Sequence, residues 1–396
     1  MSEVSKTYCP LPWRNVTVMA GDEIHPCCQF QDNALLTGDQ ESVVNVFNGK
    51  EFAHIRERML KGEPVGGCSH CYQEEEAGFK SARHWAIRDY GHVTDPKIET
   101  IELMFDNVCN SKCRDCASPH SHLWYEDEIK LYGKPIDEQK YTRTKDDLYL
   151  SLDCSNLKEI HFFGGEPLVS PLMEPFCEKL LKEADFENLD IRITTNCTLT
   201  PGPNLEQVFL KCKKLTLTLS IDAHGKLNDY FRHGSNFDKV TEVVTYFYNL
   251  AHVQRKNKET EITTNTAINL YNVNMLDDLE NWLAKHFPGL IMIKSFVHSP
   301  PFLSIQNTPQ EYKAELTEIL QSKKDYAEVI AYLNGEGEDM FPHFVNFHNK
   351  LDEIRNESLA GLNPLLEKYI EKYSANPVDS KVFFLKVIDS YRDEKE

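Results

Sequence analysis

Cysteines are the residues of this chain that most need a chemical explanation, because twelve of them occur in 396 residues. Eight fall into two groups, namely Cys9, Cys27, Cys28, Cys68 and Cys71, followed by Cys109, Cys113 and Cys116. The other four stand singly, and free cysteines of that kind usually pack as small buried hydrophobic side chains. In a reducing compartment, closely spaced cysteines indicate metal or cluster ligands rather than disulfides.

The second group has the spacing C-x3-C-x2-C. Three thiolates on a loop that leaves a strand can wrap three corners of an iron–sulfur cubane. Clusters held by cysteine normally take four such ligands, so a set of three leaves one iron open to a small molecule. Catalytic zinc sites differ from structural ones by the same kind of open position. The alternative is a zinc ion, for which His120 is the nearest further ligand.

The composition excludes several protein classes. With 41% hydrophobic and 27% charged residues, the chain can bury a sizeable core, unlike disordered or fibrous proteins. A net charge of −19 argues against a surface that binds polyanions throughout, although a local basic channel is compatible with it. No stretch approaches 18 uninterrupted apolar residues, and the start lacks a basic segment followed by an apolar one. We therefore expect a cytoplasmic protein without membrane contacts.

From about residue 97, strand and helix patterns alternate. Strands are predicted over residues 98–105, 159–163, 189–195, 214–221, 261–268 and 290–296. Helices are predicted between them, over residues 121–131, 174–184, 205–211, 237–253 and 273–287. This order predicts a parallel sheet with right-handed crossovers, either an open doubly wound sheet or an incomplete barrel. Two further helices are predicted over residues 310–333 and 344–373.

The cysteine loop after the first strand, together with Gly164-Gly165-Glu166-Pro167 after the second, resembles the radical S-adenosylmethionine (radical SAM) superfamily. The resemblance extends over about residues 97–300. It implies an α/β fold with a partial (β/α)6 TIM-like barrel over residues 96–305. It also implies a 4Fe–4S cluster on Cys109, Cys113 and Cys116, with SAM bound at the open iron.

The same resemblance implies further SAM contacts. Gly164, Gly165 and Glu166 would hold the methionine amine, since glycines permit close backbone approach and a carboxylate complements an ammonium. The remaining expected contacts lie at or beyond strand ends, where barrel enzymes gather functional side chains, and they are Asn196, Ser220, Asp222 and Arg232. For these, ordinary turn chemistry is the alternative. Asp115 departs from the family, because many members carry an aromatic residue at that position.

The N-terminal cysteines resemble the twitch module, a shortened relative of the SPASM domain, here placed over residues 1–95, before the barrel. A second 4Fe–4S cluster is then expected on Cys9, Cys27, Cys68 and Cys71. Cys28 is the alternative to Cys27, because neighbouring side chains diverge and do not easily bind one iron. A structural zinc site suits four cysteines equally well. Residues 306–396 are expected to form a helical C-terminal region.

The expected function is that of a radical SAM oxidoreductase or maturase. SAM would be cleaved reductively to a 5′-deoxyadenosyl radical, which abstracts a hydrogen atom from a peptide or protein side chain. The second cluster would handle electrons, and the external donor would resemble flavodoxin or ferredoxin. One alternative is a radical SAM enzyme acting on a nucleoside, nucleic acid or sugar, although the net charge makes nucleic acid a poor candidate. Another is a zinc-stabilised binding protein.

Overall fold

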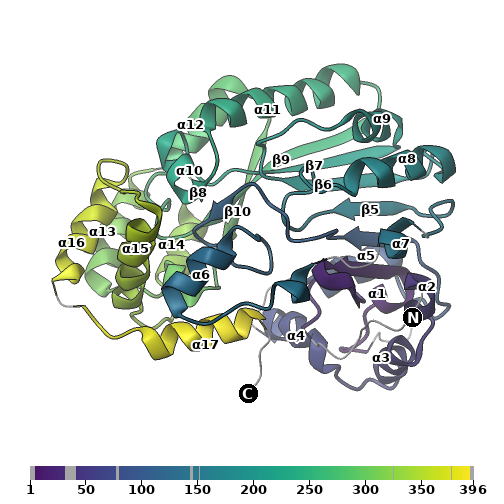
Figure 1. Ribbon diagram of the computed structural model, residues 1–396, viewed down its shortest axis with the longest axis horizontal. Helices are drawn as coiled ribbons and strands as arrows, with labels where there is room; N and C mark the ends of the chain where they lie inside the picture. Colours follow the sequence, from purple (N-terminus) through teal and green to yellow (C-terminus); the bar gives the residue numbers. More distant parts are fainter. Residues whose placement is uncertain are drawn as a thin grey trace.

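In the computed structural model, the described residues are 5–31, 42–76, 80–142, 146–150, 152–323, 325–375 and 377–392. Residues 1–4, which bear on the expected lack of a secretion signal, lie outside them. The described residues form a mostly parallel α/β sheet with helices, as predicted (Figure 1). None of their helices has the length and apolar character needed to cross a bilayer.

All six predicted strands are confirmed within two residues at each end. They are β3 (Thr100–Leu103), β5 (Glu159–Phe162), β6 (Asp190–Thr195), β7 (Lys214–Ser220), β9 (Glu259–Ile268) and β10 (Ile291–Phe296). The strand order is β10-β9-β7-β6-β5-β3-β1-β2, and every neighbouring pair except β1 with β2 is parallel. A separate antiparallel pair joins β4 (Lys112–Cys113) to β8 (Arg232–His233).

Two strands of the main sheet were not predicted, β1 (Asn15–Met19) and β2 (Glu23–His25). Strand β1 extends the sheet by lying parallel to β3, with Thr17 opposite Glu102. Both strands are short, and the alternation in β1, with Val16 and Val18 between polar residues, covers only five positions. The turn between them requires Gly21, because its φ is +77° and a Cβ there would overlap the main chain of a neighbouring segment.

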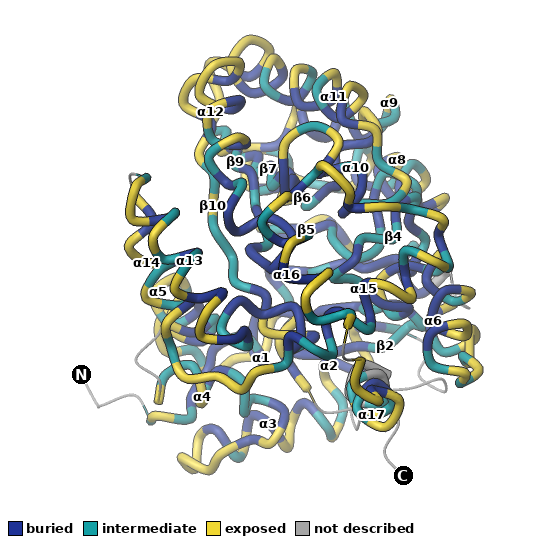
Figure 2. Tube along the Cα trace, turned by 90° about the vertical axis from the view of Figure 1, so that its left-hand side faces the viewer, coloured by how far each residue is buried: buried dark blue, intermediate teal, exposed yellow. Residues whose placement is uncertain are grey.

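Side chains alternate along the strands between a helix-covered outer face and a polar inner face. On β7, Leu215, Leu217 and Leu219 are fully buried, and the residues between them are only partly buried. The outer face packs against α8 (Met173–Glu183), α9 (Pro203–Lys211), α11 (Phe237–Asn249) and α12 (Leu276–His286) (Figure 1). These helices expose only their outward sides, as Figure 2 shows for α11 and α12.

The N-terminal segment packs into the same core as the sheet. Its helices are α1 (Leu11–Arg14), α2 (Val43–Phe47), α3 (Lys50–Leu60), α4 (Ser69–Glu76) and α5 (Ala82–Tyr90). Trp13 and Phe52 belong to one buried hydrophobic cluster with Ile101 and Phe162. Burial of these large apolar side chains is what holds the cysteine-bearing segment on the sheet.

A second core lies beyond the carboxyl ends of the strands, at the left in Figure 1. It is built by α6 (Trp124–Tyr132), α10 (Lys226–Phe231), α13 (Gln310–Gln321), α14 (Ala327–Leu333), α15 (Phe341–Arg355), α16 (Pro364–Ser374) and α17 (Lys381–Arg392). The prediction of one helix over residues 344–373 is wrong, because Asn356 adopts a left-handed φ of 51° and Pro364 starts a new helix. The helix predicted over 310–333 is likewise two. A short helix, α7 (Asp146–Leu150), precedes β5.

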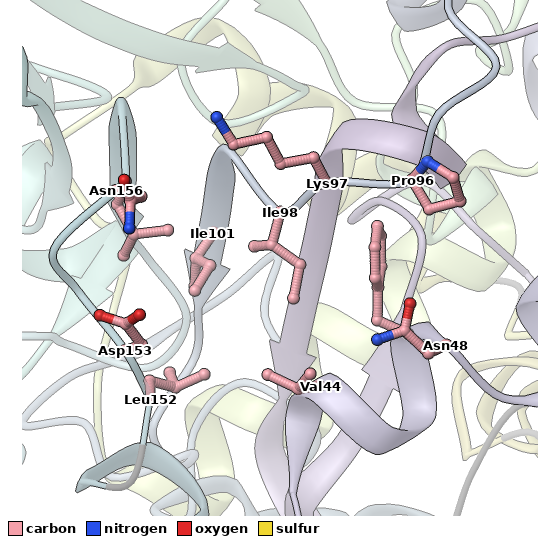
Figure 3. A pocket seen from close by; sticks show the side chains of 11 residues that line it. Val44, Asn48, Pro96, Lys97, Ile98, Ile101, Leu152, Asp153 and Asn156 are labelled. Atoms are coloured by element: carbon pink, nitrogen blue, oxygen red, sulfur yellow. The ribbon is translucent and has the colours of Figure 1, made fainter.

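A cavity of about 350 Å³ lies between α2, the start of β3 and the segment before β5 (Figure 3). Val44, Ile98, Ile101 and Leu152 give it an apolar lining, and Lys97 reaches over its edge. It is on the amino-terminal side of β3, whereas the cysteine loop leaves the carboxyl end of that strand. This cavity is therefore separate from the candidate site.

Candidate functional site

We call Cys109, Cys113 and Cys116 the cysteine triplet. The loop that carries it is held by hydrogen bonds to the chain that leads into α6. The amide of Cys109 donates to Nδ1 of His122 at 3.2 Å, and Nε1 of Trp124 donates to the Cys113 carbonyl at 3.0 Å. Pairing of β4 with β8 fixes the middle of the loop as well.

The three thiols act on one another electrostatically, with Cys109 buried and Cys113 and Cys116 partly exposed. Burial raises the pKa of Cys113 to about 12; the charge of Arg232 lowers it and that of Cys109 raises it. Burial also raises the pKa of Cys116, and the Cys113 and Cys109 thiols add to that effect. Three thiolates placed so closely repel one another and need a compensating cation. A cationic iron–sulfur core supplies such compensation, so this donor set fits a cluster.

The predicted glycine turn after β5 packs directly on the triplet loop. Gly164 has φ +114°, and a Cβ on it would overlap the Met104 side chain. A Cβ on Gly165 would overlap the Val108 carbonyl oxygen, and the amide of Glu166 donates to that same oxygen at 2.9 Å. Both glycines are required because other atoms occupy the space that a side chain would need.

Glu166 turns its carboxylate toward the end of β6. Its oxygens accept hydrogen bonds from Thr195 Oγ1 at 2.8 Å, the Asn196 amide at 2.7 Å and the Leu168 amide at 3.1 Å. Burial nevertheless leaves the pKa of Glu166 above its ordinary value. A carboxylate has about four acceptor positions, so one remains for a cationic ligand.

Asn196 and Ser220 stand at the ends of neighbouring strands. The Asn196 Nδ2 group donates to Asn110 Oδ1 at 2.8 Å and lies 3.9 Å from the Cys109 sulfur. Ser220 ends β7, lies opposite Asn265 of β9 and is partly exposed on the inner face. The structure thus brings Asn196 against the triplet loop and leaves Ser220 accessible beside it.

Asp222 and Arg232 form a buried ion pair. Nε of Arg232 donates to Oδ2 of Asp222 at 2.6 Å, and Nη1 lies 3.8 Å from the Cys113 sulfur. The other carboxylate oxygen accepts the amide of Ala267 at 2.8 Å. Each oxygen of Asp222 thus accepts a hydrogen bond from the protein, while the guanidinium keeps donors free for a ligand.

Asp115 is a further acidic group that the prediction noted only as a departure from the family. Burial, and next the charge of Asp222, raises the pKa of its carboxyl to about 7, which Arg232 partly offsets. Two carboxyls and one guanidinium therefore meet beside the second and third cysteines. The only signal for this grouping in the sequence was an acidic residue inside a cysteine loop.

The four N-terminal cysteines that were predicted to share a site are brought together. We call Cys9, Cys27, Cys68 and Cys71 the cysteine quartet. Burial raises the pKa of Cys9 to about 12, and the Cys68 and Cys71 thiols raise it further. Burial also raises the pKa of Cys27, followed by contributions from Cys9, Cys28, Glu102 and Cys68. Cys9 lies just before α1, Cys27 after β2, and the other two at the start of α4.

Cys28 is exposed, and its surroundings differ in part from those of Cys27. Burial and then the carboxylate of Glu102 raise the pKa of its thiol, and Arg192 of β6 lowers it. No cysteine contributes to this shift among the main causes, in contrast with Cys27.

A row of polar side chains crosses the inner face of the sheet, and the prediction did not include it. The register places Thr17 opposite Glu102, Glu102 opposite His161, and His161 opposite Arg192. Glu102 accepts hydrogen bonds from Thr17 Oγ1 and from the Cys28 amide. Its pKa falls to about 2, because His161 and these donors outweigh the effect of burial.

This row is separated along the sheet from Asn196, which contacts the triplet loop. His161 and Arg192 are opposite each other, and Arg192 precedes Asn196 by four residues on or just beyond the same strand. At about 3.3 Å per residue, the row and Asn196 are about 13 Å apart along the sheet. Alternation of polar residues with apolar ones on several strands was the signal that could have revealed this face.

Within the described ranges, no three His, Cys, Asp or Glu side chains converge closely enough to hold a single metal ion. For comparison, a zinc ion that binds sulfurs at about 2.3 Å requires those sulfurs to lie about 3.8 Å from each other.

Comparisons with known proteins agree with the motif. The model of the family described as "Radical SAM superfamily" matches residues 103–253, which include the cysteine triplet, the glycine turn and Arg232. The radical SAM cyclopropyl synthase TigE of Paramaledivibacter caminithermalis is 28% identical over 158 residues. That match covers 37% of this chain and 32% of TigE, so the chain matches about a third of the length of this relative.

Solved structures with similarity to the chain include those of anSMEcpe and SuiB. Native anSMEcpe with bound AdoMet has a TM-score of 0.37 and 16% identity, covering 65% of this chain and 67% of that one. SuiB of Streptococcus suis, bound to precursor peptide SuiA, has a TM-score of 0.36 and 14% identity, covering 80% of this chain and 58% of that one.

Proposed function

Because the radical SAM superfamily model matches residues 103–253, we propose that the protein is an enzyme that cleaves SAM reductively and removes a hydrogen atom from its substrate. The cysteine triplet would hold the 4Fe–4S cluster of that reaction. The observation that carries the proposal is the contact between the triplet loop and the glycine turn. Gly165 and Glu166 pack on Val108, directly before Cys109.

When bound, the cluster supplies a single electron and SAM supplies the group that removes the hydrogen atom. The chain's own residues bind and orient SAM and the cluster. The carboxylate of Glu166 would accept a hydrogen bond from the amine of SAM, and Asn196 would hold Cys109 in place. Arg232, already anchored on Asp222, has donors left for a carboxylate. Helices of the second core cover this end of the sheet and would exclude water.

We extend the proposal to a peptide or protein side chain as the substrate. The inner face supports it, because Thr194, Thr218 and Thr263 form a register of hydroxyls across three strands above the charged row. Such a face offers hydrogen-bond partners to an extended polar chain. Turnover of nucleosides, nucleic acids or sugars in the assay with SAM and dithionite would instead indicate a substrate of one of those classes.

The cysteine quartet would hold a second 4Fe–4S cluster that handles electrons. Support comes from the mutual proximity of its four thiols and from the different surroundings of Cys28. A soluble donor of the flavodoxin or ferredoxin type would provide the electrons. A reducing, cytoplasmic location is part of this proposal, because cluster ligands must stay reduced thiols.

Anaerobic reconstitution followed by iron and sulfide analysis tests the proposal. Two clusters correspond to about eight irons, and one to about four. With SAM and dithionite, the reconstituted protein should form deoxyadenosine, and the Cys113→Ser variant should not. Cys177→Ser is the matched control, since Cys177 is a fully buried cysteine of α8 far from both groups. Bound zinc with no deoxyadenosine would instead support a zinc-stabilised binding protein.

A further inference from the structure

Arg114, between the second and third cysteines of the triplet, is a charged side chain with no exposure to solvent. Its Nε donates to the Tyr230 carbonyl at 3.1 Å, and Nη2 donates to Asp352 and, at 2.7 Å, to Glu357. The guanidinium carbon lies 3.8 Å from the centre of the Tyr230 ring. A buried cation persists only with such compensation, and here both carboxylates come from the C-terminal region.

The chain conformation at the end of α15 places both carboxylates against Arg114. Asn356 turns the chain through a left-handed conformation, and the amide of Glu357 then donates to the Asp352 carbonyl at 3.0 Å. The second oxygen of Glu357 lies 2.6 Å from Nδ1 of His233 in β8. One carboxylate thus holds both Arg114 of the loop and the strand that pairs with β4. We call Arg114, His233, Asp352 and Glu357 the Arg114 ion-pair cluster.

A second tie runs from the same helix to the loop. Nε of Arg355 donates to Asp127 Oδ2 at 2.7 Å, and Asp127 also pairs with Lys112 of β4 at 2.9 Å. The Arg355 guanidinium lies 4.6 Å from the Trp124 ring, whose Nε1 donates to the Cys113 carbonyl. The C-terminal helices therefore contact the triplet loop and its neighbour α6 at two points, through ion pairs of the buried guanidinium groups of Arg114 and Arg355.

Arg114 directly follows Cys113 and precedes Cys116 by two residues. Its charge is shielded from water, and the two carboxylates that pair with it are only partly exposed, so these charges act strongly on a redox centre held by those cysteines. We propose that the Arg114 ion-pair cluster positions the triplet loop and sets the reduction potential of the iron–sulfur cluster on it. This inference rests on the proposed function. It assigns α15 and Glu357, which no sequence motif marks, to the cofactor site as positioning elements.

The test uses the full chain, reconstituted with iron and sulfide, in redox titrations followed by electron paramagnetic resonance with and without SAM. Glu357→Gln and Asp352→Asn each remove a negative charge, so the midpoint potential should move to more positive values. Arg114→Gln removes a positive charge and should move it the opposite way. Arg114→Lys keeps the charge, so it should restore the potential, while the SAM-dependent change of the spectrum should remain altered.

Glu99→Gln is the control, because Glu99 is a paired, buried carboxylate next to the amino end of β3, away from the triplet. The midpoint potential measured for the Glu99→Gln variant should equal that of the wild type. Unchanged potentials, or shifts of the same sign in Glu357→Gln and Arg114→Gln, would overturn the inference. If Arg114→Gln does not fold, the two carboxamide variants decide alone. A wild type that assembles no cluster on the triplet would instead overturn the proposed function.

Discussion

The main-chain amide of Cys28 donates a hydrogen bond of 3.0 Å to Oε2 of Glu102, across 74 residues of sequence. This bond holds the segment after β2 against the inner face of β3. The charges that act on Cys27 include those of Cys9 and Cys68, whereas those that act on Cys28 are Glu102 and Arg192. Two adjacent cysteines thereby acquire different surroundings.

The two cysteines should differ in what their loss does to iron content. Cys27→Ser should lower the iron bound after reconstitution by about four per chain, because the quartet loses a ligand. Cys28→Ser should keep the full content, since its thiol is not among the four. Iron and sulfide analysis of both variants measures this. Loss of iron in Cys28→Ser with retention in Cys27→Ser would exchange their roles.

Gly165→Ala should disturb the contact between the glycine turn and the triplet loop. The added methyl would overlap the Val108 carbonyl oxygen, so the loop has to move. Overpacking of this kind costs about 1–3 kcal/mol in the free energy of unfolding. The spectral response of the reconstituted protein to SAM should also be lost.

Gly66→Ala is the matched control for that substitution, because no atom lies within 4 Å of the Cβ it would gain. Urea unfolding and SAM titration of both variants give the comparison. A Gly165→Ala protein that keeps wild-type stability and SAM response would contradict the packing argument.

Asp222→Asn should destabilise the fold strongly. The substitution leaves the Arg232 guanidinium, 12% exposed, without its carboxylate. Breaking a buried pair by removing one partner costs about 3–5 kcal/mol. Chemical unfolding of the metal-free protein measures the loss. Glu178→Gln, which removes a partner from a surface pair with Lys182, should leave the midpoint unchanged.

Acidification should destabilise the second core through His348. Burial, and next the charge of Arg114, lowers the pKa of this imidazole to about 3 from an ordinary value near 6.5. Between these values the unfolded chain binds a proton that the folded chain does not, so stability falls as the pH drops. From pH 7.0 to 5.5 the loss attributable to His348 is about 1.3 kcal/mol.

Urea unfolding of wild type and His348→Gln at both pH values isolates this contribution, because all other groups are common to the two proteins. The free energy of unfolding of the variant, relative to that of the wild type, should be higher at pH 5.5 than at pH 7.0. Parallel pH dependences in the two proteins would show that His348 is not held neutral.

The sheet was predictable from sequence because its strands alternate. On β7, threonines and leucines alternate at successive positions, which is the two-residue period of a strand with one covered face. Strand β1 was missed although Val16 and Val18 alternate with Asn15 and Thr17, because only five residues carry the pattern and the prediction assigned no strands before residue 97. Its pairing with β3 depends on burial of Val16 and Val18 in the shared core, which is a tertiary effect.

The triplet and the glycine turn were predictable because each is contiguous in the sequence. The contacts of Arg114 were not, because Asp352 lies 238 residues away and nothing in the local sequence of either residue marks the other. Ion pairs of this kind follow from how helices pack onto a loop. The polar row of the inner face is intermediate, since its alternation is visible on each strand but its register appears only in the folded sheet.

Strand β1 is bonded along its length to β3. The triplet follows β3 and Cys27 follows β2, while Cys9 and Cys68 belong to or pack against the core that this pair shares. A ladder of main-chain bonds does not hinge. Any electrons exchanged between the two groups would therefore cross a gap of constant width, at a rate governed by distance and driving force rather than by the swing of a mobile carrier.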